Sequence, residues 1–278
     1  MFNKDLANKY IKPLYPKPTG LKAKGKLQDN IECILFDVYG TLFISESGDI
    51  EFTKDSFVIA QQINFLLERY NINKKPHDLI EDLHGTIRRV HSELVKKKID
   101  YPEVKIDEIW MEVLGISEQK AIRKFAIEFE LIANPIFPMP HLKEVLLELK
   151  RRKVTMGIIS NAQFYTPLLI KFILDSDLKN LGFSSDLIFW SYRFGYAKPS
   201  LLLFSKAFDC LKIKGISPEK VLFVGNDMLK DIYPAKEVGF KTALFAGDSR
   251  SLRLRSDDPR CKFLSADIII NDLKQLIH

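Results

Sequence analysis

Ile31-Glu-Cys-Ile-Leu-Phe-Asp37-Val-Tyr-Gly-Thr41-Leu-Phe43 contains an uninterrupted apolar run that ends at an aspartate. A short apolar run bounded by turn residues predicts a strand buried on both faces, as in parallel sheets. Gly40 and Thr41 mark the turn that follows this strand. Because ligands of open α/β sheets bind at the carboxyl ends of strands, Asp37 is expected at the mouth of a binding site.

Strand and helix patterns alternate through the second half of the chain. Amphipathic segments separate apolar runs that predict strands at 154–159, 187–190, 220–224, 241–245 and 267–270. This alternation favours a parallel sheet with helices on both faces. The predicted fold class is therefore α/β, with a parallel-sheet core built from residues 31–43 and 138–278.

The region between these two parts, residues 44–137, has helical spacing and few strand signals. Apolar residues recur at helical intervals in the segments 57–67, 76–94, 106–113 and 117–131. Prolines between 135 and 140 then break the pattern. We therefore predict an all-helical insertion after the first strand of the core.

Length and cysteine usage limit the class of protein. At 278 residues the chain can hold one core and a smaller insertion. The three cysteines are far apart and lack CxxC spacing, which argues for a reducing compartment and against a disulfide framework or a zinc site. No apolar run approaches the length of a membrane span. We expect a cytoplasmic protein without a membrane partner.

Most of the formal net charge of +6 comes from residues 1–30, which hold seven lysines and two aspartates. This basic arm also contains several prolines and glycines, so we interpret it as a solvated, partly extended leader. A nucleic-acid tether is the alternative, but little aromatic interleaving accompanies the lysines. No nucleic-acid partner is predicted, and the sequence leaves the oligomeric state open.

Polar residues follow several predicted core elements, at the positions where strands end or loops return to the same edge. Since strand ends of a parallel sheet converge at one edge, these side chains are expected to face one another. Such a set can handle a small anionic substrate: Lys198 would shield charge, Ser160 would donate to an oxyanion, and carboxylates would hold a divalent cation. The groups are Asp37 with Tyr39 and Thr41; Ser160-Asn161; Lys198-Pro199; and Asn226-Asp227 with Asp231.

The motifs DVYGT, IISN, GYAKPS and VGNDMLKD resemble those of the haloacid dehalogenase-like hydrolases, between residues 31 and 272. The resemblance implies a Rossmann-like core, a helical cap at 44–137, an aspartyl-enzyme intermediate and usually Mg²⁺. Carried over by position, Asp37 would be the nucleophile. The catalytic candidates are Asp37, Thr41 and Lys198; the substrate-binding candidates are Ser160, Asn161, Lys198 and Tyr39; the Mg²⁺ candidates are Asp37, Tyr39, Asn226, Asp227 and Asp231.

Tyr39 departs from the pattern of the family's phosphatases, which carry an aspartate two residues after the nucleophile. That aspartate protonates the leaving alcohol and then activates water, which is worth about 10²–10⁴-fold. A phenol with a pKa of about 10 can donate a proton but is a poor base near neutrality. The metal is less affected, because the family uses the backbone carbonyl at this position. DxYGT resembles instead the 2-haloacid dehalogenases, whose halide leaving group needs no proton and whose chemistry needs no metal.

The fourth motif favours phosphatase chemistry. Asp227 and Asp231 fit the spacing GDxxxD, whereas alignment on Gly225 puts Asn226 in the place of the first metal-binding acid. Dehalogenases have lost that acid, and this chain keeps two, which indicates a retained Mg²⁺ site. We predict a Mg²⁺-dependent phosphatase of a small phosphorylated metabolite, with a 2-haloacid dehalogenase or a catalytically silent binding protein as alternatives. Because of Tyr39, aryl or acyl phosphates are expected to react well and alkyl phosphates poorly.

The second helix of the insertion carries three histidines at seven-residue intervals, His77, His84 and His91, with Arg88 on the same side. They form either the polar border of an amphipathic face or a basic surface over the active site. Arg88 is kept as a substrate-binding candidate on the second interpretation. The basic loop 248–255 is interpreted as solvated, with a contact to substrate or partner as the alternative.

Overall fold

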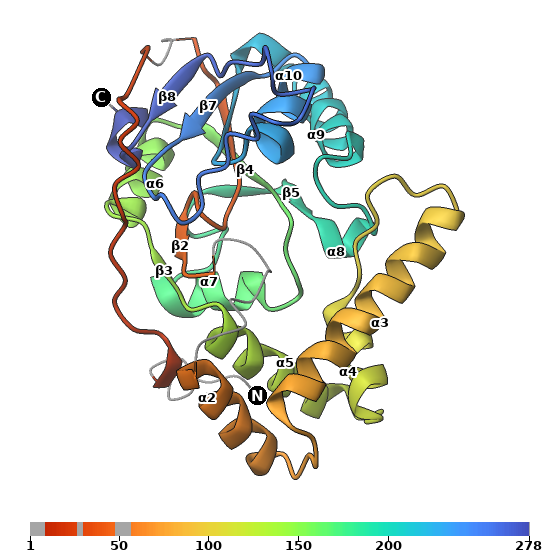
Figure 1. The fold of residues 1–278 in the computed structure, drawn as a ribbon. Helices are drawn as coiled ribbons and strands as arrows, with labels where there is room; N and C mark the ends of the chain where they lie inside the picture. The colour runs from red at the N-terminus through yellow and green to blue at the C-terminus, as the bar shows by residue number, and fades with distance from the viewer. Residues whose placement is uncertain (1–8, 27–29, 48–56, 278) are drawn as a thin grey trace.

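A six-stranded parallel sheet forms the core of the protein (Figure 1). The computed structural model describes residues 9–26, 30–47 and 57–277. The strand order is β5-β4-β1-β6-β7-β8, and every neighbouring pair is parallel. The predicted α/β fold is confirmed. The strands are β1 (Cys33–Phe36), β4 (Thr155–Ser160), β5 (Phe183–Trp190), β6 (Val221–Gly225), β7 (Lys241–Phe245) and β8 (Ile268–Ile270).

Strand β1 is buried on both faces, as its apolar run predicts. Ile34 and Phe36 pack into the hydrophobic cluster on one face of the sheet, and Cys33 and Leu35 pack into the cluster on the other. Because β4 and β6 flank β1, the residues that follow these strands lie beside one another. The helices α6 (Leu142–Arg151) and η3 (Leu273–Leu276) cover the first face, and α9 (Leu202–Ile213) and α10 (Tyr233–Glu237) cover the second.

In the described part of the chain, four helices lie between two short strands, β2 (Phe43–Ser45) and β3 (Ile136–Pro138), which pair antiparallel. Strand residues therefore occur at both ends of the insertion expected to be wholly helical at 44–137. The sequence pattern does not reveal these strands, because three residues are too few to show alternation. The four helices lie together, on the side of the molecule away from β8 (Figure 1). They are α2 (Phe57–Arg69), α3 (Pro76–Lys96), α4 (Ile106–Leu114) and α5 (Gln119–Ala133).

Aromatic residues fill the centre of the inserted helices. The ring centroid of Trp110 lies 5.0 Å from that of Phe125 and 4.7 Å from that of Phe129. The same hydrophobic cluster includes Tyr165 and Leu169, at the start of the core helix α7 (Thr166–Leu174). The inserted helices and the core are therefore joined by shared apolar packing as well as by the β2–β3 connection.

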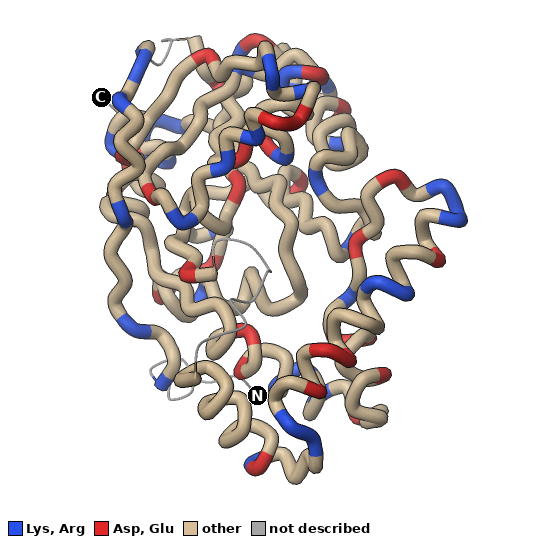
Figure 2. Tube along the Cα trace, in the orientation of Figure 1, with Lys and Arg blue, Asp and Glu red and all other residues tan. Residues whose placement is uncertain are grey.

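Residues 9–26 of the basic arm run along the molecule from the inserted helices to the edge of the sheet, with lysines spaced along them (Figures 1 and 2). The Tyr10 hydroxyl donates to Glu128 Oε2 on α5, and Thr19 Oγ1 donates to a backbone carbonyl after β7. Lys24 exchanges two backbone hydrogen bonds with β8, of 2.9 and 2.8 Å. The described part of the arm is thus bound to the fold, which differs from the solvated leader that its composition suggests.

Three shorter helices complete the described chain: α8 (Ser191–Phe194), η1 (Pro218–Lys220) and the π-helical turn η2 (Met228–Ile232). Among the described helices, none is long and apolar enough to span a lipid bilayer. All three cysteines are free thiols.

Candidate active site

The topology of the sheet brings the predicted motifs to one edge. The last residue of β1 pairs in parallel register with both β4 and β6. Asp37 follows β1, Ser160 ends β4 and Asn226 follows β6, so these three residues lie side by side at the carboxyl edge of the sheet. Lys198 reaches the same edge from the segment that follows α8.

The carboxylate of Asp37 is held through one of its two oxygens. Its Oδ1 accepts hydrogen bonds from Ser160 Oγ at 2.9 Å and from Lys198 Nζ at 2.6 Å. Its Oδ2 accepts no hydrogen bond from the parts of the chain that the structure describes. The side chain is only 8% exposed. A carboxylate fixed in this way presents one oxygen, in a fixed orientation, to a bound ligand.

Lys198 joins Asp37 to the last acid of the fourth motif. Its Nζ lies 2.6 Å from Asp37 Oδ1 and 2.5 Å from Asp231 Oδ1, and all three side chains are buried. Burial alone would lower the pKa of Lys198, but the carboxylates of Asp231 and Asp37 outweigh it and raise this pKa to about 12. Burial in turn raises the pKa of Asp231, and the lysine opposes that rise. One ammonium thus holds two carboxylates that would otherwise repel each other.

Asn161 fixes the backbone of the lysine. Its Oδ1 accepts from the Lys198 backbone N–H at 2.7 Å, and its Nδ2 donates to the Lys198 carbonyl at 3.2 Å. The structure therefore places this predicted substrate-binding residue beside the site, with its amide already bonded to the protein. Asn161 orients Lys198 in this arrangement.

Asp231 is fixed by the backbone that follows β6. Its Oδ2 accepts the backbone N–H groups of Asn226 and Asp227, both at 3.0 Å. Gly225 makes this approach possible, since a Cβ at that position would lie within 2.4 to 2.5 Å of the Asp231 side chain. The glycine of the motif is therefore required by packing against the acid six positions later in the chain.

The side chains of Asn226 and Asp227 point to different partners. Asn226 Oδ1 accepts from Thr41 Oγ1 at 3.1 Å, in the turn after the candidate nucleophile. Asp227 Oδ1 caps η2 by accepting the N–H groups of its first turn at 2.8 and 3.0 Å, and Asp227 Oδ2 accepts from Arg255 Nη2 at 2.7 Å. Asn226 and Asp231 thus lie at the site of Asp37, whereas Asp227 is bound to Arg255. The sequence spacing did not decide whether Asn226 or Asp227 would lie beside Asp37.

The hydroxyl of Tyr39 is bonded to α7. It lies 2.8 Å from Thr166 Oγ1, a partner that the sequence analysis did not anticipate. Burial raises the pKa of Tyr39, and the neighbouring carboxylate of Glu130 adds to the rise. Tyr39 is therefore a neutral phenol, and its hydroxyl already has a protein partner.

Arg88, on α3, is not joined to this group by any contact within the described residues. Arg88 is exposed and forms no hydrogen bond or ion pair within residues 9–26, 30–47 and 57–277. His91 is partly buried, its Nε2 has no partner among the described groups, and burial lowers its pKa. A neutral His91 favours the interpretation of this face as an amphipathic border. The role of Arg88 stays a prediction.

The basic loop 248–255 packs against the turn after Asp37, in contrast to the solvated loop expected. Arg250 forms an ion pair with Glu46, just beyond β2. Gly40 has a φ of +81°, and a Cβ there would lie 2.4 Å from the Cβ of Ser251 in this loop. Glycine is required at this turn both by the backbone conformation and by the closeness of the loop. No local pattern in the sequence signals this contact.

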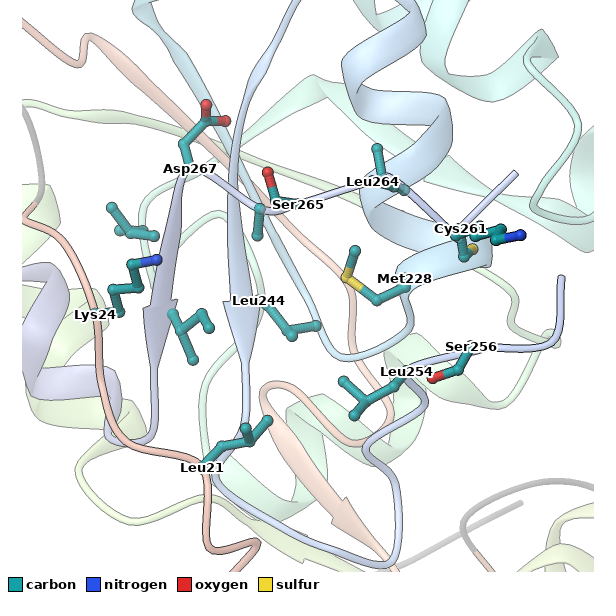
Figure 3. Close-up of a pocket in the computed structure, with 14 residues that line it drawn as sticks. Leu21, Lys24, Met228, Leu244, Leu254, Ser256, Cys261, Leu264, Ser265 and Asp267 are labelled. Atoms are coloured by element: carbon teal, nitrogen blue, oxygen red, sulfur yellow. The ribbon is translucent and has the colours of Figure 1, made fainter. Parts of the chain in front are cut away.

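A separate cavity of about 390 Å³ lies beside β7 and β8, under the arm (Figure 3). Its lining includes apolar side chains such as Leu244, Leu264 and Met228, together with Lys24 and Asp267. None of the candidate catalytic residues lines it. It is therefore distinct from the candidate active site.

The donor set around Asp37 suits a hard divalent cation. Asp37 and Asp231 supply carboxylates on either side of one ammonium, and Asn226 supplies an amide oxygen on the same edge. Mg²⁺ is usually bound by one or two carboxylates together with waters, and seldom by a closed cage of protein ligands. The described residues contain no cluster of three or more His, Cys, Asp or Glu side chains placed to hold a metal, so a bound Mg²⁺ would take its remaining ligands from water and substrate. The residues present fit Mg²⁺.

Comparison with known proteins identifies the family and supports the fold. The family model for haloacid dehalogenase-like hydrolases matches residues 31–239. The chain belongs to this family. The glyceraldehyde 3-phosphate phosphatase of Methanocaldococcus jannaschii is 30% identical to this hydrolase over 256 residues, covering 89% of this chain and 96% of that protein.

Solved structures of the family share the fold of this hydrolase. A 2-haloacid dehalogenase from Pseudomonas syringae pv. Tomato has a TM-score of 0.53 at 18% identity, over 89% of this chain and 96% of that one. A phosphatase of the family from Thermococcus onnurineus has a TM-score of 0.52 at 17% identity, over 88% and 96%. Because a dehalogenase and a phosphatase match equally well, the fold does not separate the two reactions.

Proposed function

We propose that this hydrolase is a Mg²⁺-dependent phosphatase that acts on a small phosphorylated molecule through an aspartyl-phosphate intermediate. The observation that carries the proposal is the contact of Asp37 Oδ1 with Ser160 Oγ and Lys198 Nζ, at 2.9 and 2.6 Å, which leaves Oδ2 for the substrate. Asp231 on the same lysine supplies a second carboxylate beside the proposed cation site. The phosphatase name of the Methanocaldococcus jannaschii relative supports phosphatase over dehalogenase chemistry.

The reaction would use Asp37 as a covalent nucleophile. A bond forms from Oδ2 to phosphorus while the bond from phosphorus to the leaving oxygen breaks, which gives an aspartyl phosphate and the released group. Water then attacks the phosphorus, the bond to Asp37 breaks, and inorganic phosphate leaves. Ser160 Oγ and Lys198 Nζ stand beside the reacting carboxylate and can bond the phosphoryl oxygens, where charge develops.

Asp37, Asp231 and the amide oxygen of Asn226 would hold Mg²⁺, with the Tyr39 carbonyl that the family pattern implies. When bound, the cation would neutralise charge on the phosphoryl oxygens. Asp227 is the weaker candidate of the two alternatives that the spacing allows, because its carboxylate binds Arg255 and the first turn of η2, whereas Asn226 Oδ1 bonds to Thr41 in the turn after Asp37.

Protonation of the leaving group is the step for which this site is poorly equipped. Tyr39 occupies the position of the usual acid, and its hydroxyl is bonded to Thr166 at 2.8 Å. General acid help is worth about 10²–10⁴-fold when the leaving group is a poor one. The proposed substrates are therefore aryl or acyl phosphates, whose leaving groups depart without a proton. Alkyl phosphates, among them glyceraldehyde 3-phosphate, would react slowly.

We also propose the division of the chain into a catalytic core and a cap. Residues 31–43 and 138–278 would form the catalytic core, and residues 44–137 would form a cap that excludes water from the site. The packing of Tyr165 and Leu169 against the inserted helices supports a cap that rests on the core. The arm at 1–30, a cytoplasmic location and a substrate contact by Arg88 stay predictions.

The test is a panel of aryl, acyl and alkyl phosphates and of 2-haloacids, assayed for phosphate and halide release with Mg²⁺ and with a chelator. We expect phosphate release that requires Mg²⁺ and is lost in Asp37→Asn. Asp186→Asn is the matched control, since Asp186 is exposed on β5 and pairs only with Lys214 and Ser184 in the described chain. Halide release that persists with the chelator would replace this proposal by a dehalogenase.

A further inference from the structure

A connecting segment between two of the inserted helices contacts the core next to Lys198. Residues 100–104 lie between α3 and α4, and Pro102 forms an antiparallel bridge with Tyr196. The Glu103 N–H donates to the Gly195 carbonyl at 3.0 Å, and the N–H next to Lys198 in the chain donates back to this segment at 2.7 Å. The insertion therefore pairs, by its backbone, with the stretch that leads directly into Lys198.

The side chain of Glu103 bonds to both loops that carry the anion-binding groups. Its Oε2 accepts from Ser191 Oγ at 2.6 Å, and Ser191 Oγ accepts from the Ala162 N–H at 2.9 Å. Its Oε1 accepts from Gln163 Nε2 at 3.2 Å. Ala162 and Gln163 follow Ser160 closely in the chain, and Ser191 begins the segment that ends at Lys198.

The contact is reciprocal, because Gln163 also binds the insertion. Its Nε2 donates to the Val104 carbonyl at 2.9 Å, and its Oε1 accepts from the Ile106 N–H at 3.0 Å. Each of the two anion-binding loops of the core is thus attached to residues 103–106. Movement of this segment cannot leave Ser160 and Lys198 in place unless these hydrogen bonds break.

The carboxylate of Glu103 is a titratable group at this junction. Burial raises the pKa of Glu103 to about 7, against the bonds from Ser191, Val104 and Gln163 and the charge of Lys230, which lower it. The charged or titratable neighbours that face it are Lys230 of η2 and Tyr165 before α7. An ionised carboxylate makes stronger hydrogen bonds than a neutral one, so the attachment is firmer above neutrality.

We infer that Glu103 is a positioning residue, which holds the loops of Ser160 and Lys198 in place from the insertion. Through it, the position of the inserted helices on the core affects binding of the phosphoryl group. This rests on the proposed phosphatase reaction for its kinetic consequence. The attachment itself is a property of the fold and can be tested without turnover.

The kinetic test compares wild type with Glu103→Gln, which keeps the shape and loses the charge. The probes are inorganic phosphate as a competitive inhibitor and an aryl phosphate as substrate. At about pH 6 we expect wild type and variant to have nearly equal kcat/KM and nearly equal inhibition constants for phosphate. At about pH 8 we expect the kcat/KM of the variant to be about tenfold lower than that of wild type, and its inhibition constant about tenfold higher. Taking ratios removes the ionisation of phosphate itself. Asp107→Asn is the matched control, a buried acid of the same insertion that pairs with Arg123.

The second readout is amide hydrogen exchange of the intact chain. In Glu103→Ala we expect faster exchange at 161–163 and 195–198, with no such change in Asp107→Asn. Exchange and inhibition constants that are unchanged in both Glu103 variants, or a wild-type to variant ratio that does not vary with pH, would overturn the inference. If wild type releases no phosphate but the exchange result holds, the proposed reaction fails and the attachment stands.

Discussion

Glu103→Gln should make the stability of the protein less sensitive to rising pH. The pKa of Glu103 is raised from its ordinary value of 4.5 to about 7, chiefly by burial. As pH rises, the carboxyl of the unfolded chain loses its proton before that of the folded protein. The contribution of Glu103 to the free energy of unfolding is therefore fully present below pH 4.5 and is lost as pH rises through about 7. At about 1.4 kcal/mol per pKa unit, the loss is at most ~3 kcal/mol, and water that reaches the partly exposed side chain reduces it.

The measurement is urea unfolding of wild type and variant at a series of pH values from about 4.5 to about 8. Glutamine does not titrate, so the unfolding free energy of the variant minus that of wild type should rise across this range. Glu148→Gln is the control, because hydrogen bonds from Arg151 and Arg152 lower the pKa of Glu148 to about 2. For this variant, the difference in unfolding free energy from wild type should stay flat above about pH 4.5. A flat or falling difference for Glu103→Gln would refute the reasoning, since it would mean that the buried carboxyl is not costly to ionise.

Three further substitutions test the site. Lys198→Met should lower the unfolding free energy by ~3–5 kcal/mol in urea titrations, because it leaves two buried carboxylates without their cation; a loss below about 1 kcal/mol would contradict the buried triad. Gly40→Ala should destabilise by more than ~1 kcal/mol in the same assay, since its Cβ would lie 2.4 Å from Ser251 Cβ, and a neutral result would mean that the loop yields freely. Tyr39→Phe loses the bond to Thr166, worth ~0.5–1.5 kcal/mol, and should change kcat less than about tenfold; a larger fall would make the hydroxyl a proton donor.

The prediction for Glu103 also explains why an acid is retained at a costly position. Its ionised form is the less stable one in the folded protein, yet it makes the stronger bonds to Ser191 and Gln163. Stability is therefore lost over the pH range in which the anion-binding loops are held more firmly. At about pH 8, Glu103→Gln should therefore raise the free energy of unfolding and weaken phosphate binding, as expected where stability is lost in favour of function.

The core and the central residues of the site could be predicted because their positions follow from local patterns. Asp37 and Ser160 each stand where a buried strand ends, and parallel strands end at one edge. The choice between Asn226 and Asp227 could not be made in the same way. It depends on Arg255, which lies far along the chain and captures the Asp227 carboxylate. Spacing within a motif carries no information about such a partner.

The attachment of the insertion was beyond sequence reasoning for a related reason. Residues 100–104 have neither helical nor strand periodicity, and they are ordered by pairing with 195–197, which is distant in the chain. Glu103 resembles any surface acid until that pairing places it against Ser191 and Gln163 of the core. The same holds for Gln163, whose amide bonds to the insertion on both its donor and its acceptor side.

The arm shows where composition misleads. Its lysines predict side chains in water, and Lys24 satisfies that expectation in its side chain, which is exposed. The backbone of Lys24 nevertheless pairs with β8, the last strand of the sheet, which would otherwise present unpaired N–H and C=O groups. Charge describes what a side chain prefers, whereas the edge of a sheet binds any backbone that can lie extended beside it. A basic, proline-containing segment can therefore be solvated along its side chains and bound to the fold along its main chain.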